Sequence, residues 1–327
     1  MASLISCRRS QFGGPLKNIS SGNVRRSLRG AALLLLAFAM LGSLPAPAVA
    51  QTKKILFLAG PRDHGMPGRH EYERDLRTLA ESFDNASNLN DITTQVIVGR
   101  LPRDLTPIKG AAVIVINSSS DRAGYETHPL FPPDPSTDHH GYDPETMAYL
   151  ESLEDLLKQE KIGVVVLHYA LWAENWRARE YYMNWLGGLW VQIGSKNPTD
   201  EWSMTLENES HPILRGVKPW TYRDEVFCRF LLPSDARRTN LILATPKQDK
   251  GAIGPQIASW AYERDDGGRG FAFGGADFRD NLAREDYRRF LMNGIAWAAR
   301  MEIPREGIQS PTPDVSEVSP ASPPRSK

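Results

Sequence analysis

GVVVLH, residues 163–168, is apolar on both faces and contains three consecutive valines. A strand with this pattern is typical of the middle of a parallel sheet, where helices cover both faces. The segment before it, residues 143–161, carries apolar side chains at helical spacing. It opens with Asp143 as a candidate N-cap and Pro144 at the first helical position. A helix that leads directly into a buried strand predicts the α/β class.

Further strand-like runs lie on both sides of this pair. Three of them precede it, at residues 53–59, 92–98 and 111–117. A helix is expected at residues 70–83, and a last one at residues 284–301. After Trp202 the runs follow one another without long helices between them: EWSMTL, YRDEVFCRF, NLILAT, QIASWAYE and GRGFAFGGA. We therefore predict a doubly wound, mostly parallel α/β sheet with helices on both faces. The extra C-terminal strands either extend the sheet or form an antiparallel flap.

The two ends of the chain differ in composition from the rest. Residues 1–50 hold six basic and no acidic residues, then the apolar run AALLLLAFAML and the small residues of PAPAVA. This order predicts a bacterial-type signal peptide that is cleaved after Ala50, and hence a periplasmic or extracellular protein. Whether the Sec or the Tat route is used stays open. At the other end, the Pro- and Ser-rich residues 306–327 predict a disordered tail, which leaves residues 51–305 as one folded domain.

Charge and cysteine content exclude several classes of protein. The chain has 39 basic and 39 acidic residues, and loss of the signal peptide leaves 33 basic residues against 39 acidic ones. No basic run remains, so nucleic acid is not an expected partner. Cys228 is then the one remaining cysteine, which excludes an intramolecular disulfide. Its apolar context, VFCRFLL, predicts a buried and inert thiol.

Polar residues follow the ends of several predicted strands. Asp63 and His64 follow the first strand within GPRDHGMPGRHEYERD, residues 60–75. Other such residues are Asn117, His168, Tyr169 and Asp277, and Asp224 and Glu225 lie in YRDEVF. In doubly wound sheets, ligands bind beyond the carboxyl ends of the strands. We therefore expect these side chains to converge on one cleft.

The motifs are specific enough to mark a family. GPxxHGxxxxHE after a strand, VLHYA, HPILRG, DEVF, ASWAYERDDGGRGFAFGGADF and NGIAWAARMEIP together resemble the ThuA-like (trehalose-utilization) family over residues 53–305. The resemblance implies a flavodoxin-like fold of the class I glutamine amidotransferase type and a role in sugar use, with proposals centred on oxidised 3-keto sugars. It carries over Asp63, His64, His70, Glu71, His168, Asp224, Glu225 and Arg269 as site residues. Where the family often has a histidine after the paired glycines, this chain has Ala276 followed by Asp277.

Several catalytic mechanisms have no support in the sequence. In the glutamine amidotransferases, the residue after the central strand is a nucleophilic cysteine on a tight elbow. This chain has LHYAL there, so His168 replaces that cysteine and glutamine hydrolysis by a thioester is excluded. The chain also lacks G-x-S-x-G, a G-x-G-x-x-G after the first strand, and a Walker A loop.

Three functions remain open. In the first, His168 acts as acid or base on a keto sugar, with Asp63, His64 and His70 steering the proton and the carbonyl, as in an isomerase, epimerase or lyase. In the second, His64, His70 and His168 bind Zn, Mn or Fe in a metal-dependent sugar hydrolase or isomerase. The third is a non-catalytic carbohydrate-binding or structural domain.

The expected partner is a small sugar or glycoside, with a homo-oligomer left open and no stable membrane insertion after cleavage. The candidate substrate-binding residues are Glu71, Asn117, Tyr169, Trp172, Asp224, Glu225, Arg269 and Asp277. Tryptophan can stack on sugars, although the group of aromatic residues between 172 and 202 is more typical of core packing.

A long Pro-rich loop, residues 118–142, interrupts the pattern. Its length indicates either a lid that carries His128, His139 and His140 over the cleft or a solvated insertion. His211, in SHPILRG, is expected to have a structural role at a turn before Pro212.

Overall fold

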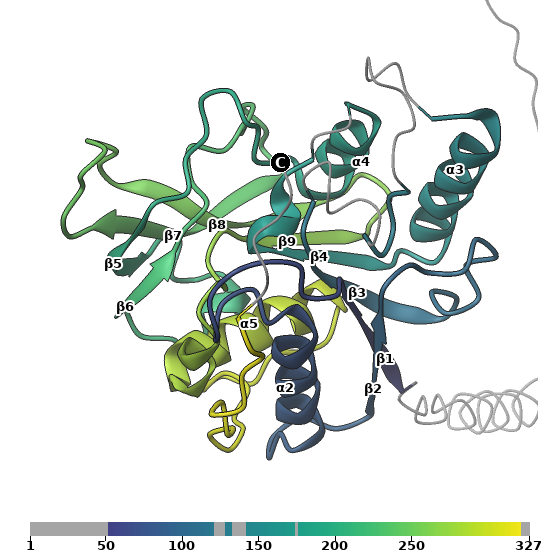
Figure 1. Ribbon diagram of the computed structural model, residues 1–327. Coiled ribbons are helices and arrows are strands. Elements are labelled where there is room, and N and C mark those ends of the chain that lie inside the picture. Colours follow the sequence, from purple (N-terminus) through teal and green to yellow (C-terminus); the bar gives the residue numbers. More distant parts are fainter. Residues whose placement is uncertain (1–51, 121–127, 133–141, 174–175, 322–327) are drawn as a thin grey trace, which may run out of the picture. The chain divides into compact units, whose positions relative to one another are not determined.

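The computed structural model describes residues 52–120, 128–132, 142–173 and 176–321 (Figure 1). Residues 51–327 form one compact unit. The predicted signal peptide at residues 1–50 lies outside the described residues. His139 and His140 of the expected lid also lie outside them.

One nine-stranded sheet forms the centre of this unit, in the order β2-β1-β3-β4-β9-β8-β7-β5-β6. The first five strands in this order are parallel, and the pairs from β9 to β6 are antiparallel. The bounds are β1 (Lys53–Ala59), β2 (Ile92–Val98), β3 (Ala111–Asn117), β4 (Gly163–Leu167), β5 (Thr199–Leu206), β6 (Trp220–Glu225), β7 (Arg238–Pro246), β8 (Gln256–Glu263) and β9 (Arg269–Phe273). The predicted doubly wound α/β sheet is confirmed. The C-terminal strands extend the sheet.

Burial of the strands follows their place in the sheet. Every residue of β4 is buried, because the strand lies between β3 and β9 and is covered on both faces. By contrast, β2 lies at one edge and alternates between partly buried and exposed residues. The valine run that predicted a central strand is therefore in the middle of the parallel part.

Helices cover both faces of the parallel strands (Figure 1). One face carries α2 (Tyr72–Asp84) and α5 (Glu285–Ala298), and the other carries α3 (Pro144–Gln159) and α4 (Trp176–Leu186). Asp143 caps α3, as predicted, by accepting a hydrogen bond from the backbone N–H of Thr146. The helix α4 was not predicted. Among the described residues, no helix has the length and apolar character needed to cross a membrane.

Two glycines allow the helices to pack closely on the sheet. A Cβ atom on Gly163 of β4 would lie 2.3 Å from the carbonyl oxygen of Ala298, and one on Gly270 of β9 would lie 2.2 Å from that of Trp185. Any larger residue would push α5 or α4 away from these central strands. The same strands carry site residues at their carboxyl ends, so this packing also supports the site.

The C-terminal segment differs from the expected disordered tail. Residues 302–321 contain no helix or strand, yet Ile303 and Ile308 are buried in the core. The backbone N–H of Ile308 donates to Asn293 Oδ1 of α5 at 3.0 Å. Isolated apolar residues can anchor an extended segment although its average composition is polar, which is why composition alone predicted disorder here.

Candidate functional site

His168 stands at the turn that leaves the central strand. It begins the short 3₁₀ helix η2 (His168–Leu171) with a φ of 50°, a strained conformation for a residue other than glycine. Its side chain is fully buried, and Nδ1 is 3.1 Å from the carbonyl oxygen of Gly274. Because a carbonyl can only accept, Nδ1 donates its proton to Gly274, and in the tautomer with this single proton the lone pair lies on Nε2. The elbow where an amidotransferase has a thiol thus presents an imidazole lone pair.

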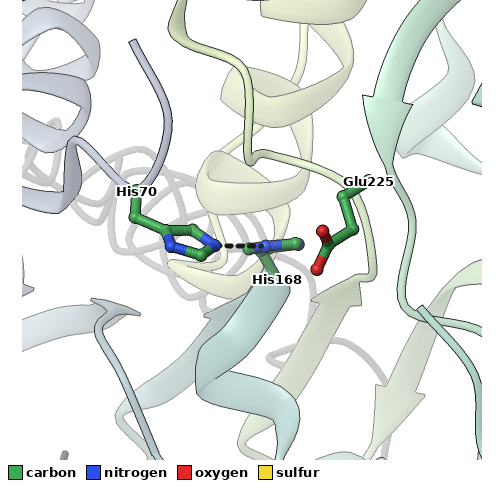
Figure 2. A group of neighbouring side chains, drawn as sticks. All are labelled: His70, His168 and Glu225. Carbon is green, nitrogen blue, oxygen red and sulfur yellow. Dashed lines mark hydrogen bonds between the residues drawn. The ribbon is translucent and has the colours of Figure 1, made fainter. Parts of the chain in front are cut away.

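His70 approaches this lone pair from the loop after β1. Its backbone is also strained, with a φ of 53°, and its N–H donates to the carbonyl oxygen of Asp277 at 3.2 Å. The Nε2 atom of His70 lies 3.4 Å from His168 Nε2 (Figure 2). Burial, and then the neighbouring His168, His64 and Arg69, lower the pKa of His70 well below its usual value. His70 is therefore neutral near neutral pH, and its ring nitrogens can act as donors or ligands.

Two carboxylates and a guanidinium complete the cluster. Arg69 Nε lies 2.5 Å from Asp277 Oδ2, and its Nη2 lies 2.5 Å from Glu225 Oε2. Asp277 Oδ1 lies 3.1 Å from His70 Nε2 and 4.0 Å from His168 Nε2, and this buried oxygen accepts no hydrogen bond from the residues that the structure describes. Burial raises the pKa of Asp277, and the nearby His168 and Arg69 oppose the rise. Its carboxylate oxygen is thus directed at both imidazoles.

Asp224 shapes the backbone that carries Asp277. Its buried carboxylate accepts hydrogen bonds from the backbone N–H groups of Ala276, Asp277 and Phe278 at 2.9–3.2 Å. Ala276 has a φ of 90°, which is unusual for a residue with a side chain. Burial, and then the neighbouring Asp277, raise the pKa of Asp224 well above its usual value. Asp224 is therefore a structural residue next to the site, not a group that contacts a ligand.

His64 and Asp63 lie on the more exposed side of the cluster. His64 Nδ1 is 2.6 Å from Asp63 Oδ1, and the side chain of His64 is 28% exposed. Its ring centroid lies 4.1 Å from that of His70. A carboxylate that accepts from Nδ1 orients the imidazole and leaves Nε2 for proton transfer. The pair thus has the form of a general acid or base beside the buried histidines.

Nitrogen and oxygen atoms of the cluster suit a divalent cation. One atom each from His70, His168 and Glu225 lie within 4.8 Å of one another (Figure 2). Two nitrogens bound to a tetrahedral metal at about 2.0–2.1 Å would stand about 3.3–3.4 Å apart, and the two Nε2 atoms are 3.4 Å apart. The bond from His168 Nδ1 to Gly274 is the kind of support that metal-binding histidines use. From the sequence we expected His64, His70 and His168 as metal ligands. In the structure, Glu225 and not His64 lies with His70 and His168.

Comparison with known proteins shows a similarity to one family. The ThuA family model, described as trehalose utilisation, matches residues 146–298. A ThuA-like protein from Bacteroides uniformis is 14% identical with a TM-score of 0.52, covering 79% of this chain and 95% of that one. Another, from Parabacteroides merdae, is 16% identical with a TM-score of 0.52, covering 80% and 98%. The expected resemblance to the ThuA family is thus confirmed over residues 146–298.

A glutamine amidotransferase from Thermotoga maritima also matches, with 9% identity, a TM-score of 0.43, and coverage of 76% of this chain and 99% of that one. No curated protein matches the chain. In this chain the residue at the turn after β4 is His168. Cys228 lies in a different segment and is buried, and burial raises the pKa of its thiol to about 12. A thiol in that state is a poor nucleophile.

Most of the predicted site residues meet in this fold. Asp63, His64, His70, His168, Tyr169, Glu225 and Asp277 form one cluster. They meet because β1, β4 and β9 are parallel, so that their carboxyl ends share one edge of the sheet. Tyr169 stacks on the ring of His70 at a centroid distance of 5.6 Å.

Other predicted residues lie apart from the cluster. Arg269 begins β9 at the end opposite to Asp277, where Nη1 donates to the carbonyl oxygen of Trp297. Glu71 is buried, and its carboxylate accepts hydrogen bonds from Ser319. Asn117 lines a small cavity with neighbours that include Asp75 and Ala276. Trp172 packs between Tyr169 and Trp190 and is partly buried. Direct substrate contact by Arg269, Glu71 or Asn117 has no support in this geometry.

Two other histidines have structural partners. His128 Nδ1 accepts hydrogen bonds from the backbone N–H groups of Leu130 and Phe131, and burial lowers the pKa of His128 to about 3. His211 accepts from the N–H of Ile213 at 3.3 Å, in agreement with its expected role at a turn. His128 therefore stabilises a turn and does not belong to an exposed lid.

Arg69 and Gly274 were not predicted as site residues. Arg69 bridges the two carboxylates, and Gly274 supplies the carbonyl that orients His168. An arginine next to a histidine in a loop has no distinctive spacing, and a backbone carbonyl leaves no trace in the sequence. Arg69 is recognisable only once β6 and β9 bring Glu225 and Asp277 to the same place.

Proposed function

We propose that this ThuA-like chain is an enzyme of carbohydrate metabolism that uses acid/base chemistry and a divalent cation on the carbonyl of an oxidised sugar or glycoside. The observation that carries the proposal is the 3.4 Å approach of the Nε2 atoms of His70 and His168, with Asp277 Oδ1 only 3.1 Å from His70 Nε2. We assign the cation to His70, His168 and Glu225, with Asp277 as a further oxygen donor. Mixed nitrogen and oxygen donors of this kind suit Zn, Mn or Fe.

The balance of charge in the cluster favours a cation. Glu225 and Asp277 share the one guanidinium of Arg69, and Asp224 is buried behind them. His70 adds no positive charge near neutral pH because its pKa is lowered. The pKa values of Asp277 and Asp224 are raised, so the site favours uptake of positive charge, either as protons or as a metal ion.

The chemistry divides between the buried and the exposed parts of the cluster. A bound divalent cation supplies Lewis-acid polarisation of a substrate carbonyl. His64, oriented by Asp63, moves a proton at the carbon next to that carbonyl. This assignment gives the acid/base role to His64 and not to His168, because His168 is fully buried and its Nε2 faces the cation-binding group.

The substrate class rests on the family and on the rim of the site. The matching family model is described as trehalose utilisation. Asn197 donates to Glu225 at 3.0 Å, and Asp63 and His64 are partly exposed, so polar groups suited to sugar hydroxyls lie beside the cluster. Tyr169 and Trp172 provide aromatic surface next to them. The basic and apolar N-terminal segment supports action outside the cytoplasm, which fractionation of cells that express the full chain would test.

One experiment tests both parts of the proposal. Purified protein is analysed for metals and then incubated with glucosides and their 3-keto forms, with and without added Zn, Mn or Fe, and products are measured by mass spectrometry. We expect about one metal ion per chain and metal-dependent conversion of a keto sugar. Glu225→Gln should lose both the bound metal and the conversion. Glu201→Gln should lose neither, because Glu201 lies on β5 in an exposed ion pair with Lys247. Conversion at full rate in metal-free protein would overturn the metal assignment, and no conversion of any keto sugar would overturn the substrate class.

A further inference from the structure

The C-terminal segment contacts two of the chain segments that supply residues to the proposed cation site, the one with His70 and the one with Asp277. The carbonyl oxygen of Glu317 accepts from Arg279 Nε at 2.9 Å, and Arg279 lies two residues after Asp277. Ser319 and Pro320 contact the loop that leads to His70. The segment is in turn anchored to the core by Ile303 and Ile308. It therefore connects the core to both segments that supply the site.

Glu71 is the first point of contact. Its carboxylate accepts hydrogen bonds from the backbone N–H of Ser319 at 2.8 Å and from Ser319 Oγ at 2.6 Å. It also accepts from the N–H of Gly68 at 3.2 Å and lies 3.6 Å from Arg62 Nε. Glu71 directly follows His70, so these bonds hold the turn in which His70 has its strained backbone. A buried carboxylate with this many donors is held firmly in place.

Arg62 is the second point of contact. Its guanidinium donates to the carbonyl oxygens of Gly65 at 2.6 Å, Met66 at 2.9 Å and Arg69 at 3.3 Å, all within the same loop. It also donates to the carbonyl oxygen of Pro320 at 2.5 Å. One side chain therefore joins the loop to the C-terminal segment. A strained residue such as His70 keeps its conformation only when its surroundings determine it in this way.

We propose that residues 311–320 act as a strap that positions His70, with Ser319, Glu71 and Arg62 as positioning residues. The part of this inference that concerns the cation rests on the proposed function. The strap itself is defined by hydrogen bonds to the loop and does not require a metal. A first coordination sphere is precise only when a supporting shell locks it, and here that shell comes from the far end of the chain.

The first test measures the loop directly, in the full-length protein. In Ser319→Ala we expect backbone amides of residues 62–71 to exchange hydrogen about tenfold faster than in the wild type, because Glu71 loses a donor. Ser319→Thr keeps the hydroxyl and should restore wild-type exchange. Ser316→Ala, at an exposed residue of the same segment, is the matched control. Unchanged exchange in Ser319→Ala, or equal acceleration in the control, would overturn the strap.

The second test measures the consequence for the site. Titration with Co²⁺, followed by its visible absorption, should show about tenfold weaker binding in Ser319→Ala, with recovery in Ser319→Thr and no change in Ser316→Ala. Equal affinity in Ser319→Ala and the wild type would overturn the link between the strap and His70. If the wild type binds no Co²⁺, the metal assignment is wrong, and hydrogen exchange still decides whether the strap holds the loop.

Discussion

His168 and His70 are 98 residues apart in the chain, and their Nε2 atoms are 3.4 Å apart in the fold. Both residues have positive φ values, 50° for His168 and 53° for His70. Each such conformation costs of order 1–3 kcal/mol and persists only where the rest of the structure enforces it. The fold thus holds two strained residues so that one ring nitrogen of each faces the other.

His168→Asn tests the elbow histidine. Asparagine tolerates a positive φ and can still donate to Gly274, but it has no counterpart to Nε2. We expect a loss of at least about 100-fold in turnover of any accepted keto sugar, with a cost in stability of no more than about 2 kcal/mol. Steady-state kinetics and urea unfolding measure the two effects. His211→Asn, which keeps a good capping residue at its turn, should retain full turnover, and equal losses in both variants would argue against a special role for His168.

Arg69→Gln tests the guanidinium between the carboxylates. Arg69 lowers the pKa of Asp277, so its loss should raise that pKa further and remove the ion pair with Glu225. Because protons compete with a cation for the carboxylates, the acid limb of Co²⁺ binding should move to higher pH. We expect a shift of about one pH unit or more, measured by titration at a series of pH values.

Arg69→Lys is the matched control for this shift. It keeps the charge but lacks the fixed spacing of guanidinium donors that bridges Asp277 and Glu225, so the acid limb should move less than in Arg69→Gln while affinity still falls. A pH profile that is the same in Arg69→Gln and the wild type would contradict the assigned role.

Asp224→Asn tests the support of the loop that carries Asp277. The carboxylate accepts four backbone hydrogen bonds, from Glu225, Ala276, Asp277 and Phe278, and an amide N–H₂ in place of one oxygen would face a donor. We expect a loss of about 2–4 kcal/mol in the free energy of unfolding, since a buried N–H is left unsatisfied. Chemical denaturation measures it. Asp104→Asn, at an exposed turn, should cost much less, and similar losses in both variants would show that the bonds of Asp224 are weak.

His128→Asn tests the pH dependence of stability. The pKa of His128 is about 3 in the folded chain, below its ordinary value of 6.5, so between about pH 6.5 and 3 the unfolded state binds the extra proton. The contribution of His128 to the free energy of unfolding is complete above about pH 6.5. Below that it falls by about 1.4 kcal/mol per pH unit. Asparagine can still accept from Leu130 and Phe131 but does not titrate.

The difference between the wild type and His128→Asn isolates this effect from other groups. The stability contribution of Asp75 changes with pH in the opposite direction, because burial raises its pKa to about 7. The total pH dependence of the wild type is therefore a sum of opposing contributions. Thermal or urea unfolding at pH 7.5, 6, 5 and 4 should show the advantage of the wild type shrinking as the pH falls. A constant difference across this range would mean that His128 is not a buried neutral histidine.

Much of the fold follows from short-range patterns. The valines of residues 163–168 require burial on both faces, and Asp143 with Pro144 marks a helix start that the structure contains. Such signals depend only on neighbouring residues, so they predict these elements from the sequence without tertiary contacts. The helix α4 and the docked segment after residue 302 were missed because tertiary packing, not local pattern, holds them.

The chemistry of the site divides in the same way. Strand ends place Asp63, His64, His168 and Asp277 at one edge of the sheet, and parallel pairing makes that inference possible from the residues alone. Which atoms face each other depends on long-range contacts: Arg69 joins Asp277 to Glu225, Gly274 orients His168, and Ser319 holds Glu71 beside His70. The local patterns that predict strands and helices depend on side-chain size and polarity, which are properties of each residue alone. The direction of a lone pair is set by partners up to 248 residues away, and only the folded chain brings them together.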